Sequence, residues 1–125
     1  MAEITFTGNK MLKSINKEWC NKFPYLYLGF YKADGKGQAS WTVTHSTIRG
    51  KKGADELSTT ASMKVDTFEK RYEAAYGSKV EIKYIIGGKA FRTLGEHNDL
   101  TLTAMNAWAK EKGGVEIMKE KPDWF

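Results

Sequence analysis

Apolar residues recur every three or four positions in two segments of the chain that lie 53 residues apart. This spacing places them along one side of a helix, while the intervening Lys, Glu, Asn, Asp and Arg suit an exposed side. Asn9 and Ser62 precede the two segments as candidate N-caps, and Pro24 and Gly77 end them. The pattern therefore predicts two amphipathic helices whose apolar stripes share one core. The stripes are Leu12, Ile15, Trp19 and Phe23, and then Val65, Phe68, Tyr72 and Tyr76.

Apolar and polar residues alternate after each predicted helix, as they do in half-buried strands. The second alternating segment leads to Gly87-Gly88, which suits a two-residue hairpin turn with positive φ. The first leads to a looser Gly-rich turn and to the alternating Trp41 and Val43. A short helical segment is expected near residues 45–50 and a longer helix over residues 101–112. The predicted strand positions are Leu26, Leu28 and Phe30, and then Val80, Ile82 and Tyr84.

Each half of the chain thus follows the order strand, helix, strand, strand. We expect an α+β fold in which two pseudo-repeats, about residues 3–52 and 56–112, form a sheet with helices packed on it. Such an arrangement is ferredoxin-like or related. Residues 113–125 would extend this single domain of residues 1–125. The likeness of the halves is explained either by duplication or by the general similarity of β-α-β units, and the pattern leaves both open.

A series of short motifs runs from Ser62 to Asn106. A Val-x-x-Phe-Glu helix start and a Tyr-Gly stop precede a strand, a hairpin and an Asp-x-Thr-Leu segment. The residues are Val65, Phe68, Glu69, Tyr76, Gly77, Val80, Ile82, Asp99, Thr101, Leu102 and Asn106. The series resembles a family of small uncharacterised bacterial proteins. Phe91 stands where that family has Trp, and Ala104 replaces a capping-box Glu. The resemblance implies a shared fold and a bacterial origin, and it implies no activity.

Composition narrows the class of protein. The formal net charge is +5, but acidic residues are interspersed with the basic ones, which is typical of a solvated surface. Cys20 is the only cysteine, so an intrachain disulfide is excluded. It lies next to the apolar stripe of the first helix and is expected to be a small buried side chain. The first residues lack the apolar core of a signal peptide, and no apolar run reaches membrane-spanning length, so we expect a cytoplasmic protein.

The two histidines are the first candidates for catalysis or metal binding. His97 stands beside Glu96 and Asp99, but adjacent side chains of a loop diverge, and no further ligands follow. Capping of the last helix by Asp99 or Thr101 explains this polar run. His45 has hydroxyl side chains nearby, yet sequence neighbours rarely form a catalytic pair. We therefore expect no enzyme, no cofactor and no metal site.

The predicted strand after the first helix turns three tyrosines to the face away from the apolar positions. Aromatic rings flanked by basic loops are a platform on which single-stranded nucleic acids stack. However, Glu81 would share this face and repel phosphates. Alternatively, the last helix covers the tyrosines with Leu102, Met105, Trp108 and Ala109. The residues of the nucleic-acid hypothesis are Tyr25, Tyr27, Tyr31, Lys32, Lys36, Arg49, Lys51 and Lys52.

Two large aromatic residues, Trp124 and Phe125, follow Pro122 at the end of the chain. Such rings either fold back onto the core or bind another protein. Our main hypothesis is a non-catalytic module that binds another protein or its own copy, with Trp124 and Phe125 as candidate contact residues. The alternative hypothesis is a basic module that binds single-stranded nucleic acid.

Overall fold

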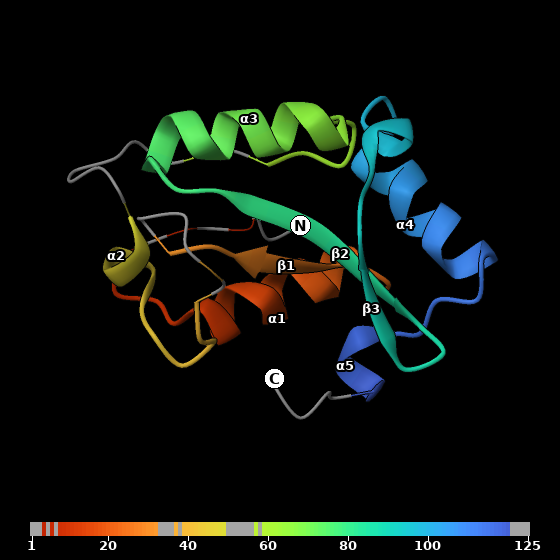
Figure 1. The fold of residues 1–125 in the computed structure, drawn as a ribbon, viewed down its shortest axis with the longest axis horizontal. Coiled ribbons are helices and arrows are strands. Elements are labelled where there is room, and N and C mark those ends of the chain that lie inside the picture. Colours follow the sequence, from red (N-terminus) through yellow and green to blue (C-terminus); the bar gives the residue numbers. More distant parts are fainter. Residues whose placement is uncertain are drawn as a thin grey trace.

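The computed structural model describes residues 4, 6, 8–32, 37, 39–49, 57 and 59–120 (Figure 1). Helices and strands are mixed, and the sheet is three-stranded and antiparallel, so the fold is α+β. In chain order the elements are α1 (Leu12–Lys22), β1 (Tyr27–Phe30), α2 (His45–Ile48), α3 (Val65–Tyr76), β2 (Val80–Ile86), β3 (Lys89–Arg92), the 3-10 turn Gly95–His97, α4 (Leu102–Glu111) and α5 (Ile117–Glu120).

The strands follow the order β1-β2-β3, with Leu28 of β1 opposite Ile82 of β2 and Tyr84 of β2 opposite Phe91 of β3. Gly87 and Gly88 join β2 to β3 with φ angles of 59° and 79°, which confirms the predicted hairpin turn. The pairing of β2 with β3 continues up to this turn, where Ile86 lies opposite Lys89. This hairpin carries β3 to one edge of the sheet (Figure 1).

The main core confirms that the two predicted stripes pack together. Trp19 of α1 and Phe68 of α3 are both fully buried, and their ring centroids lie 5.0 Å apart. The apolar side of the sheet and three buried residues of α4 complete this core. Its helical and strand members include Leu12, Ile15, Trp19, Phe23, Leu28, Phe30, Val65, Phe68, Tyr72, Tyr76, Ile82, Leu102, Met105 and Ala109.

A second, smaller core lies around Tyr27, which is only 4% exposed. The ring of Trp41 covers it at a centroid distance of 5.8 Å, and Ile117 of α5 belongs to the same cluster. The expectation that the last long helix covers Tyr27 is therefore wrong, because α4 packs into the main core instead. Cys20 is also buried here, as expected, and burial raises the pKa of its thiol to about 12.

The starts of α1 and α2 bond to each other. The N–H of Leu12 donates to the carbonyl of Val43 at 3.0 Å, and the N–H of His45 donates to the carbonyl of Lys10 at 2.8 Å. The next amide of each helix makes an equivalent bond. The N–H of Lys13 donates to the carbonyl of Trp41, and the N–H of Ser46 donates to the carbonyl of Gly8. Amides that normally require a capping side chain are thereby paired with backbone.

The starts of α3 and α4 make the same four bonds. The N–H of Val65 donates to the carbonyl of Leu100 at 2.9 Å, and the N–H of Leu102 donates to the carbonyl of Met63 at 2.8 Å. The next amides, of Asp66 and Thr103, donate to the carbonyls of Asn98 and Ala61. The N-caps of α1 and α3 are Met11 and Lys64, without a side-chain cap. The predicted caps Asn9 and Ser62 are thus wrong, because backbone carbonyls already accept from these amides. Thr101 does cap α4, as predicted, since its hydroxyl accepts from the amide of Ala104 at 3.1 Å.

Two further features of the fold differ from the sequence prediction. Trp41 and Val43, expected on a strand, lie in the turn that precedes α2. Their carbonyls accept hydrogen bonds from the first amides of α1. The expected short helix after them is confirmed as α2. Ile4 and Phe6 are buried in the main core without belonging to a strand in the part of the chain that is described. Among the described residues no helix is both long and apolar enough to cross a membrane.

Candidate functional site

The two edges of the sheet differ in how their backbone groups are satisfied. On the outer edge of β1, the side chain of Asn16 from α1 bonds both backbone groups of Leu28. Its Oδ1 accepts from the N–H at 2.7 Å, and its Nδ2 donates to the carbonyl at 3.1 Å. The N–H of Ala39 donates to the carbonyl of Phe30 at 2.8 Å. This edge is therefore closed to another strand.

The opposite edge is β3, and all four of its residues are exposed. Phe91 stacks on Tyr84 with ring centroids 5.6 Å apart, yet 41% of Phe91 stays exposed. Leu94, just beyond the strand, is 49% exposed. Edge strands that present unpaired backbone groups together with apolar side chains are templates for pairing with another chain.

The orientation of the β3 backbone follows from the bond between the N–H of Thr93 and the carbonyl of Ile82, at 3.0 Å. In an antiparallel pair, residues alternate between those that bond to the partner and those that point away. Thr93, Phe91 and Lys89 therefore face β2, whereas the N–H and carbonyl groups of Ala90 and Arg92 point outward. These two residues provide the bonds that an added strand would use.

The charged side chains of the β2–β3 hairpin are mainly basic. Lys83 stands directly opposite Arg92 in the register, on the same face of the sheet, and Lys89 lies next to the turn. Lys89 and Arg92 are exposed. Arg92 is partly compensated by Glu81 at 3.9 Å, but Lys83 and Lys89 take part in none of the ion pairs found among the described residues. The open edge thus favours an acidic partner.

A polar groove of about 810 Å³ lies where β2 continues past the end of β3. The last paired residues are Lys83 of β2 and Arg92 of β3, so β2 residues 80–82 extend beyond the ladder. Helix α3 and the chain after β3 form the other walls. The lining residues that carry charge are Lys32, Glu69, Lys70, Glu73, Lys79, Glu81 and Arg92.

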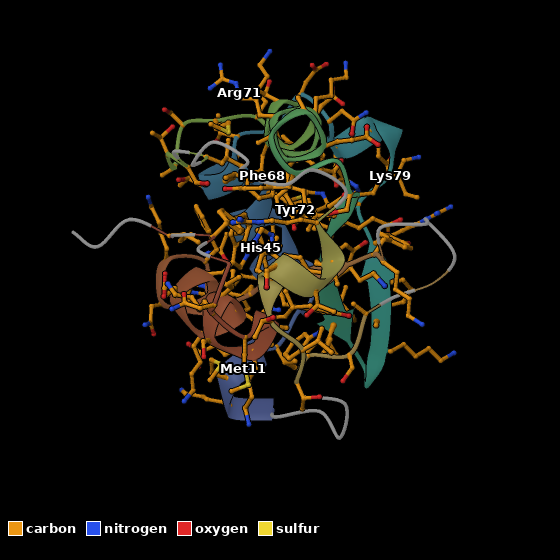
Figure 2. The ribbon with its side chains drawn as sticks, turned by 90° about the vertical axis from the view of Figure 1, so that its left-hand side faces the viewer. Met11, His45, Phe68, Arg71, Tyr72 and Lys79 are labelled. Carbon is orange, nitrogen blue, oxygen red and sulfur yellow. The ribbon has the colours of Figure 1, made fainter. Side chains whose placement is uncertain are left out.

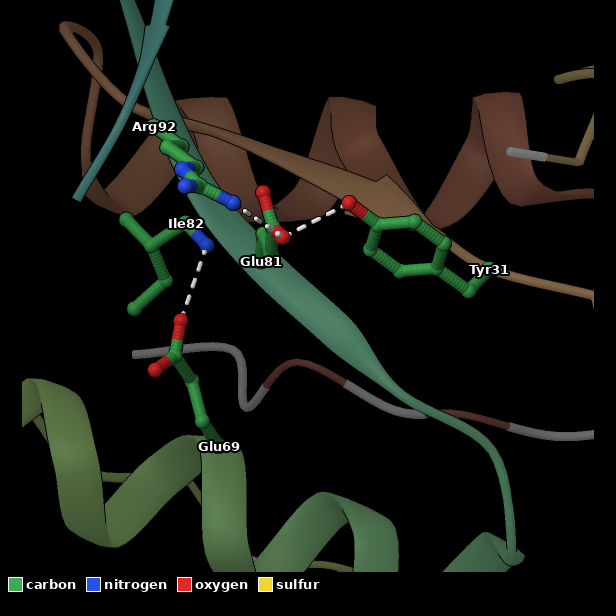
Figure 3. A network of polar contacts seen from close by, with 5 residues as sticks. All are labelled: Tyr31, Glu69, Glu81, Ile82 and Arg92. Atoms are coloured by element: carbon green, nitrogen blue, oxygen red, sulfur yellow. Dashed lines mark hydrogen bonds and ion pairs between the residues drawn. The ribbon is translucent and has the colours of Figure 1, made fainter. Parts of the chain in front are cut away.

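Glu69 reaches from α3 to the strand at this point (Figure 3). Its Oε2 accepts from the N–H of Ile82 at 3.3 Å, the position that a carbonyl of a continuing strand would take. Burial first, and then the nearby carboxylates of Glu81 and Asp66, raise the pKa of Glu69 to about 7, against the lowering effects of the Ile82 N–H and the Thr93 hydroxyl. The neutral form of Glu69 is therefore favoured more than that of an exposed glutamate.

Glu81 points to the other side of β2 and has two partners (Figure 3). The hydroxyl of Tyr31 donates to its Oε1 at 2.6 Å, and a guanidinium nitrogen of Arg92 lies 3.9 Å from the same oxygen. The Glu81 carboxylate is thus held between a hydroxyl of β1's extension and a guanidinium of β3. The two glutamates of the groove therefore differ in that Glu81 has a nearby cation, whereas Glu69 is in none of the ion pairs among the described residues.

A buried polar cluster lies near the start of α2 (Figure 2). His45 is fully buried and its Nε2 is 2.6 Å from the hydroxyl of Tyr72, while the Nε of Arg49 donates to its Nδ1 at 2.9 Å. The Arg49 guanidinium also donates to the carbonyl of Phe6 and lies 4.9 Å from the ring centroid of Tyr76. Arg49, a candidate phosphate contact from the sequence, is thus committed to this cluster.

The other candidate residues are scattered. Tyr27 is buried, whereas Tyr31 and Lys32 meet at the groove. Tyr25 is half-buried beside α4, where Asn106 accepts its N–H at 2.9 Å and the Lys110 ammonium lies 5.9 Å from its ring centroid. Lys36, Lys51, Lys52, Trp124 and Phe125 lie outside the described residues.

The remaining histidine, His97, is 1% exposed and packs against Trp108 at a centroid distance of 4.4 Å. Its Nδ1 accepts from the N–H of Leu94 at 2.9 Å, so it fixes the turn before α4. In the described part of the chain, no group of three or more His, Cys, Asp or Glu side chains is arranged to hold a metal ion.

Sequence reasoning did not identify Glu69 or the open edge as site features. In the sequence Glu69 belongs to the helix-start motif, but its approach to Ile82 depends on where β3 ends. The sequence predicts Glu81 only as a charge on the sheet face that carries the tyrosines. That prediction follows from the alternation of side chains along β2. Comparison of the chain with protein-family models, curated proteins and solved structures finds no match.

Proposed function

We propose that the protein is a non-catalytic binding module that adds an extended segment of another protein to the outer edge of β3. The observation that carries this proposal is the contrast between the two edges of the sheet. Asn16 and Ala39 close β1, whereas β3 is exposed at all four residues. Added strands gain affinity from main-chain bonds and specificity from alternate side chains.

The charges of the hairpin favour a partner segment that alternates apolar and acidic residues. Phe91 and Arg92 project from opposite faces of β3, so apolar residues of such a segment would pack on Phe91 and acidic residues would lie on the face that carries Arg92 and Lys83. A second copy of the chain is the other partner that we proposed from the sequence. Antiparallel pairing of two β3 strands would bring Lys89 and Arg92 of both copies to one edge, and like charges close together repel. A foreign acidic segment is therefore favoured.

The proposal that the module is non-catalytic is supported by the burial of the candidate nucleophile and of the candidate base. The thiol of Cys20 is buried with its pKa raised to about 12, so it carries no thiolate at neutral pH. His45 is buried with both ring nitrogens engaged. A catalytic pair requires such groups to reach a substrate.

The alternative function, binding of single-stranded nucleic acid, keeps one supporting observation. Tyr31 and Lys32 lie together at the groove, next to the exposed Lys79. Against it, Tyr27 is covered by Trp41 and offers no ring for stacking. Titration with a labelled oligonucleotide at low and moderate salt tests this alternative, because phosphate binding weakens steeply with salt. Absence of binding at low salt would exclude it.

We also infer that the chain contains two structural repeats with a ferredoxin-like or related arrangement. The reciprocal bonds at the helix starts support this, because the α3 donors lie 53 positions after those of α1, and the α4 donors 57 positions after those of α2. A cytoplasmic location remains part of the proposal. So does a contact role for Trp124 and Phe125, which deletion of residues 122–125 tests through loss of association at unchanged thermal stability.

Strand addition is tested with a proline at the outward-facing position of β3. Ala90→Pro removes an N–H that points away from β2, and proline is tolerated on edge strands. Ala90→Ser is the matched control, because it keeps the N–H. The probe is an acetylated peptide of alternating Val and Glu, titrated into ¹⁵N-labelled protein. We expect shifts in β3 for the wild type and Ala90→Ser, and at least about tenfold weaker binding by Ala90→Pro.

Two results would contradict the proposal. One is equal affinity of Ala90→Pro and Ala90→Ser for the Val-Glu peptide, which would show that the outward backbone of β3 makes no contribution. The other is an equally strong response to a peptide of alternating Val and Lys, which would remove the charge argument. Retained melting temperature of Ala90→Pro shows that the variant is folded, and Phe91→Ser provides a second variant that leaves the backbone unchanged.

A further inference from the structure

The outer edge of β3 has a defined length. Its outward backbone groups belong to Ala90 and Arg92, and the next residue in this alternation is Leu94. The N–H of Leu94 donates to Nδ1 of His97 at 2.9 Å, and its carbonyl accepts from the N–H of His97 at 2.9 Å. At the other end the chain turns at Gly88, whose φ is 79°. An added strand therefore meets two outward-facing residues with one residue between them.

The residue between these two is Phe91. Its backbone groups face β2, so a residue of an added antiparallel strand would stand opposite Phe91 in a pair without hydrogen bonds. The Cα atoms of such a pair lie about 4.5 Å apart, closer than in a hydrogen-bonded pair, and the side chains are closer as well. The partner residue opposite Phe91 therefore makes the closest side-chain contact at this edge.

A row of aromatic rings leads across the sheet to Phe91. Trp108 of α4 meets Tyr84 of β2 edge-on at a centroid distance of 5.4 Å, and Tyr84 stacks on Phe91 at 5.6 Å with an angle of 18° between the ring planes. Tyr84 is only 6% exposed, whereas Phe91 is 41% exposed. The row is thus buried at its inner end and open at the edge of the sheet. One more ring on an added strand would extend it, and aromatic pairs across strands stabilise a sheet.

The other face of the edge favours one direction of the added strand. Arg92 stands opposite Lys83 in the register, whereas Ala90 stands opposite the buried Ile85. Glu81, at 3.9 Å from Arg92, compensates one of the two cations, which leaves the other to attract an acidic residue. An antiparallel strand therefore gains most from an acidic residue opposite Arg92, one position before the residue at its centre.

We propose that the segment added to β3 runs antiparallel to it and carries an acidic residue followed directly by an aromatic residue. The aromatic ring stands opposite Phe91 and the acidic side chain opposite Arg92. This inference rests on the proposed strand addition and names the kind of partner that the edge selects. The backbone groups of Ala90 and Arg92 bind any extended segment, whereas the contact with Phe91 distinguishes one segment from another.

The test uses three probe peptides with acetylated and amidated ends. They are Thr-Glu-Phe-Thr-Thr, Thr-Glu-Val-Thr-Thr and the reversed sequence Thr-Thr-Phe-Glu-Thr. Each is titrated into ¹⁵N-labelled full-length protein, and the amide shifts of Ala90 and Arg92 are followed. We expect the first peptide to bind about fivefold more tightly than the valine peptide, as an aromatic pair across two strands would give. It should bind about threefold more tightly than the reversed peptide, whose acidic residue would stand opposite Ala90.

Variants of the protein locate the effect. Phe91→Ser removes the ring and keeps the backbone, so it should abolish the preference for phenylalanine over valine. Ala90→Ser, on the other face of the same strand, is the matched control and should keep that preference. Thermal unfolding shows whether each variant is folded, which is expected because both positions are exposed.

The outcomes separate this inference from strand addition itself. Shifts of Ala90 and Arg92 with equal affinity for the phenylalanine and valine peptides would overturn the inference and leave strand addition intact. The same holds for a phenylalanine preference that survives Phe91→Ser in the folded variant, and for a reversed peptide that binds as tightly as the first. If none of the peptides shifts these amides, strand addition fails and the inference fails with it.

Discussion

The Nε2 atom of His45 lies 2.6 Å from the hydroxyl oxygen of Tyr72, and neither side chain is exposed (Figure 2). Because Arg49 donates to Nδ1, that nitrogen carries no proton in this arrangement, and the proton resides on Nε2, which donates to the Tyr72 oxygen. The pair therefore requires a neutral imidazole. Burial, and then the Arg49 charge, lower the pKa of His45 to about 4 from its ordinary 6.5.

Acidification should destabilise the protein through His45. Its pKa is lower in the folded state than in the unfolded state, so the unfolded chain takes up the proton first as the pH falls. The contribution of the neutral form is present above pH 6.5 and is lost progressively as the pH falls to about 4, by up to about 3 kcal/mol. Urea unfolding at pH 7 and pH 4.5 measures the loss, and His45→Gln should reduce it. Identical pH dependence in the two proteins would contradict this assignment.

Truncation in the shared core should be costly. Trp19→Ala or Phe68→Ala removes a fully buried ring from the contact between α1 and α3, which should lower the free energy of unfolding by about 3–5 kcal/mol. Thermal unfolding measures this, with the exposed Lys17→Ala on α1 as the control. Unchanged melting of either ring variant would show that the stripes do not share one core.

Asn16→Ala should have two effects. It leaves the N–H and carbonyl of Leu28 without their partner, which should cost roughly 2–5 kcal/mol because buried backbone groups are expensive to leave unpaired. It also opens the second edge of the sheet, so association at high concentration should increase. Denaturant unfolding and light scattering measure the two effects. Asn21→Ala, exposed on the same helix, should show neither.

Gly114→Ala should destabilise the connection to α5. A Cβ at this position would lie 2.6 Å from the carbonyl oxygen of Ala109, which is backbone and already accepts from the Gly114 N–H at 2.7 Å. Overpacking of this kind typically costs about 1–3 kcal/mol. Gly95→Ala is the control, because no heavy atom lies within 4 Å of the place that its new methyl group would take. Equal melting temperatures for the two variants would refute the close approach at Gly114.

The helices and the hairpin could be predicted because their signals are local. The stripe from Leu12 to Phe23 has the helical period, and the Gly-Gly pair fits the positive φ angles of its turn. The helix caps were wrong at Asn9 and Ser62 for a non-local reason. Carbonyls from residues some 30 positions away accept the first amides, and neither the sequence nor propensity reveals this pairing.

The groove could not be predicted for a related reason. The place of Glu69 in it depends on the point at which β3 leaves β2, because only then can Glu69 reach the N–H of Ile82. The tyrosine strand was placed correctly, but Trp41 and Ile117 cover Tyr27 from segments whose path no periodicity indicates. Local patterns thus indicate the elements, while the surfaces depend on contacts between distant residues.

The paired helix starts also affect the dynamics of the molecule. Amides of a first helical turn usually exchange with solvent quickly, because they bond to water or to a single side chain. Here Leu12, His45, Val65 and Leu102 each donate to a carbonyl of the partner segment, so a helix start can open only when its partner also opens. We therefore expect fraying to be confined to the C-terminal ends, and each pair, α1 with α2 and α3 with α4, to open as one cooperative unit.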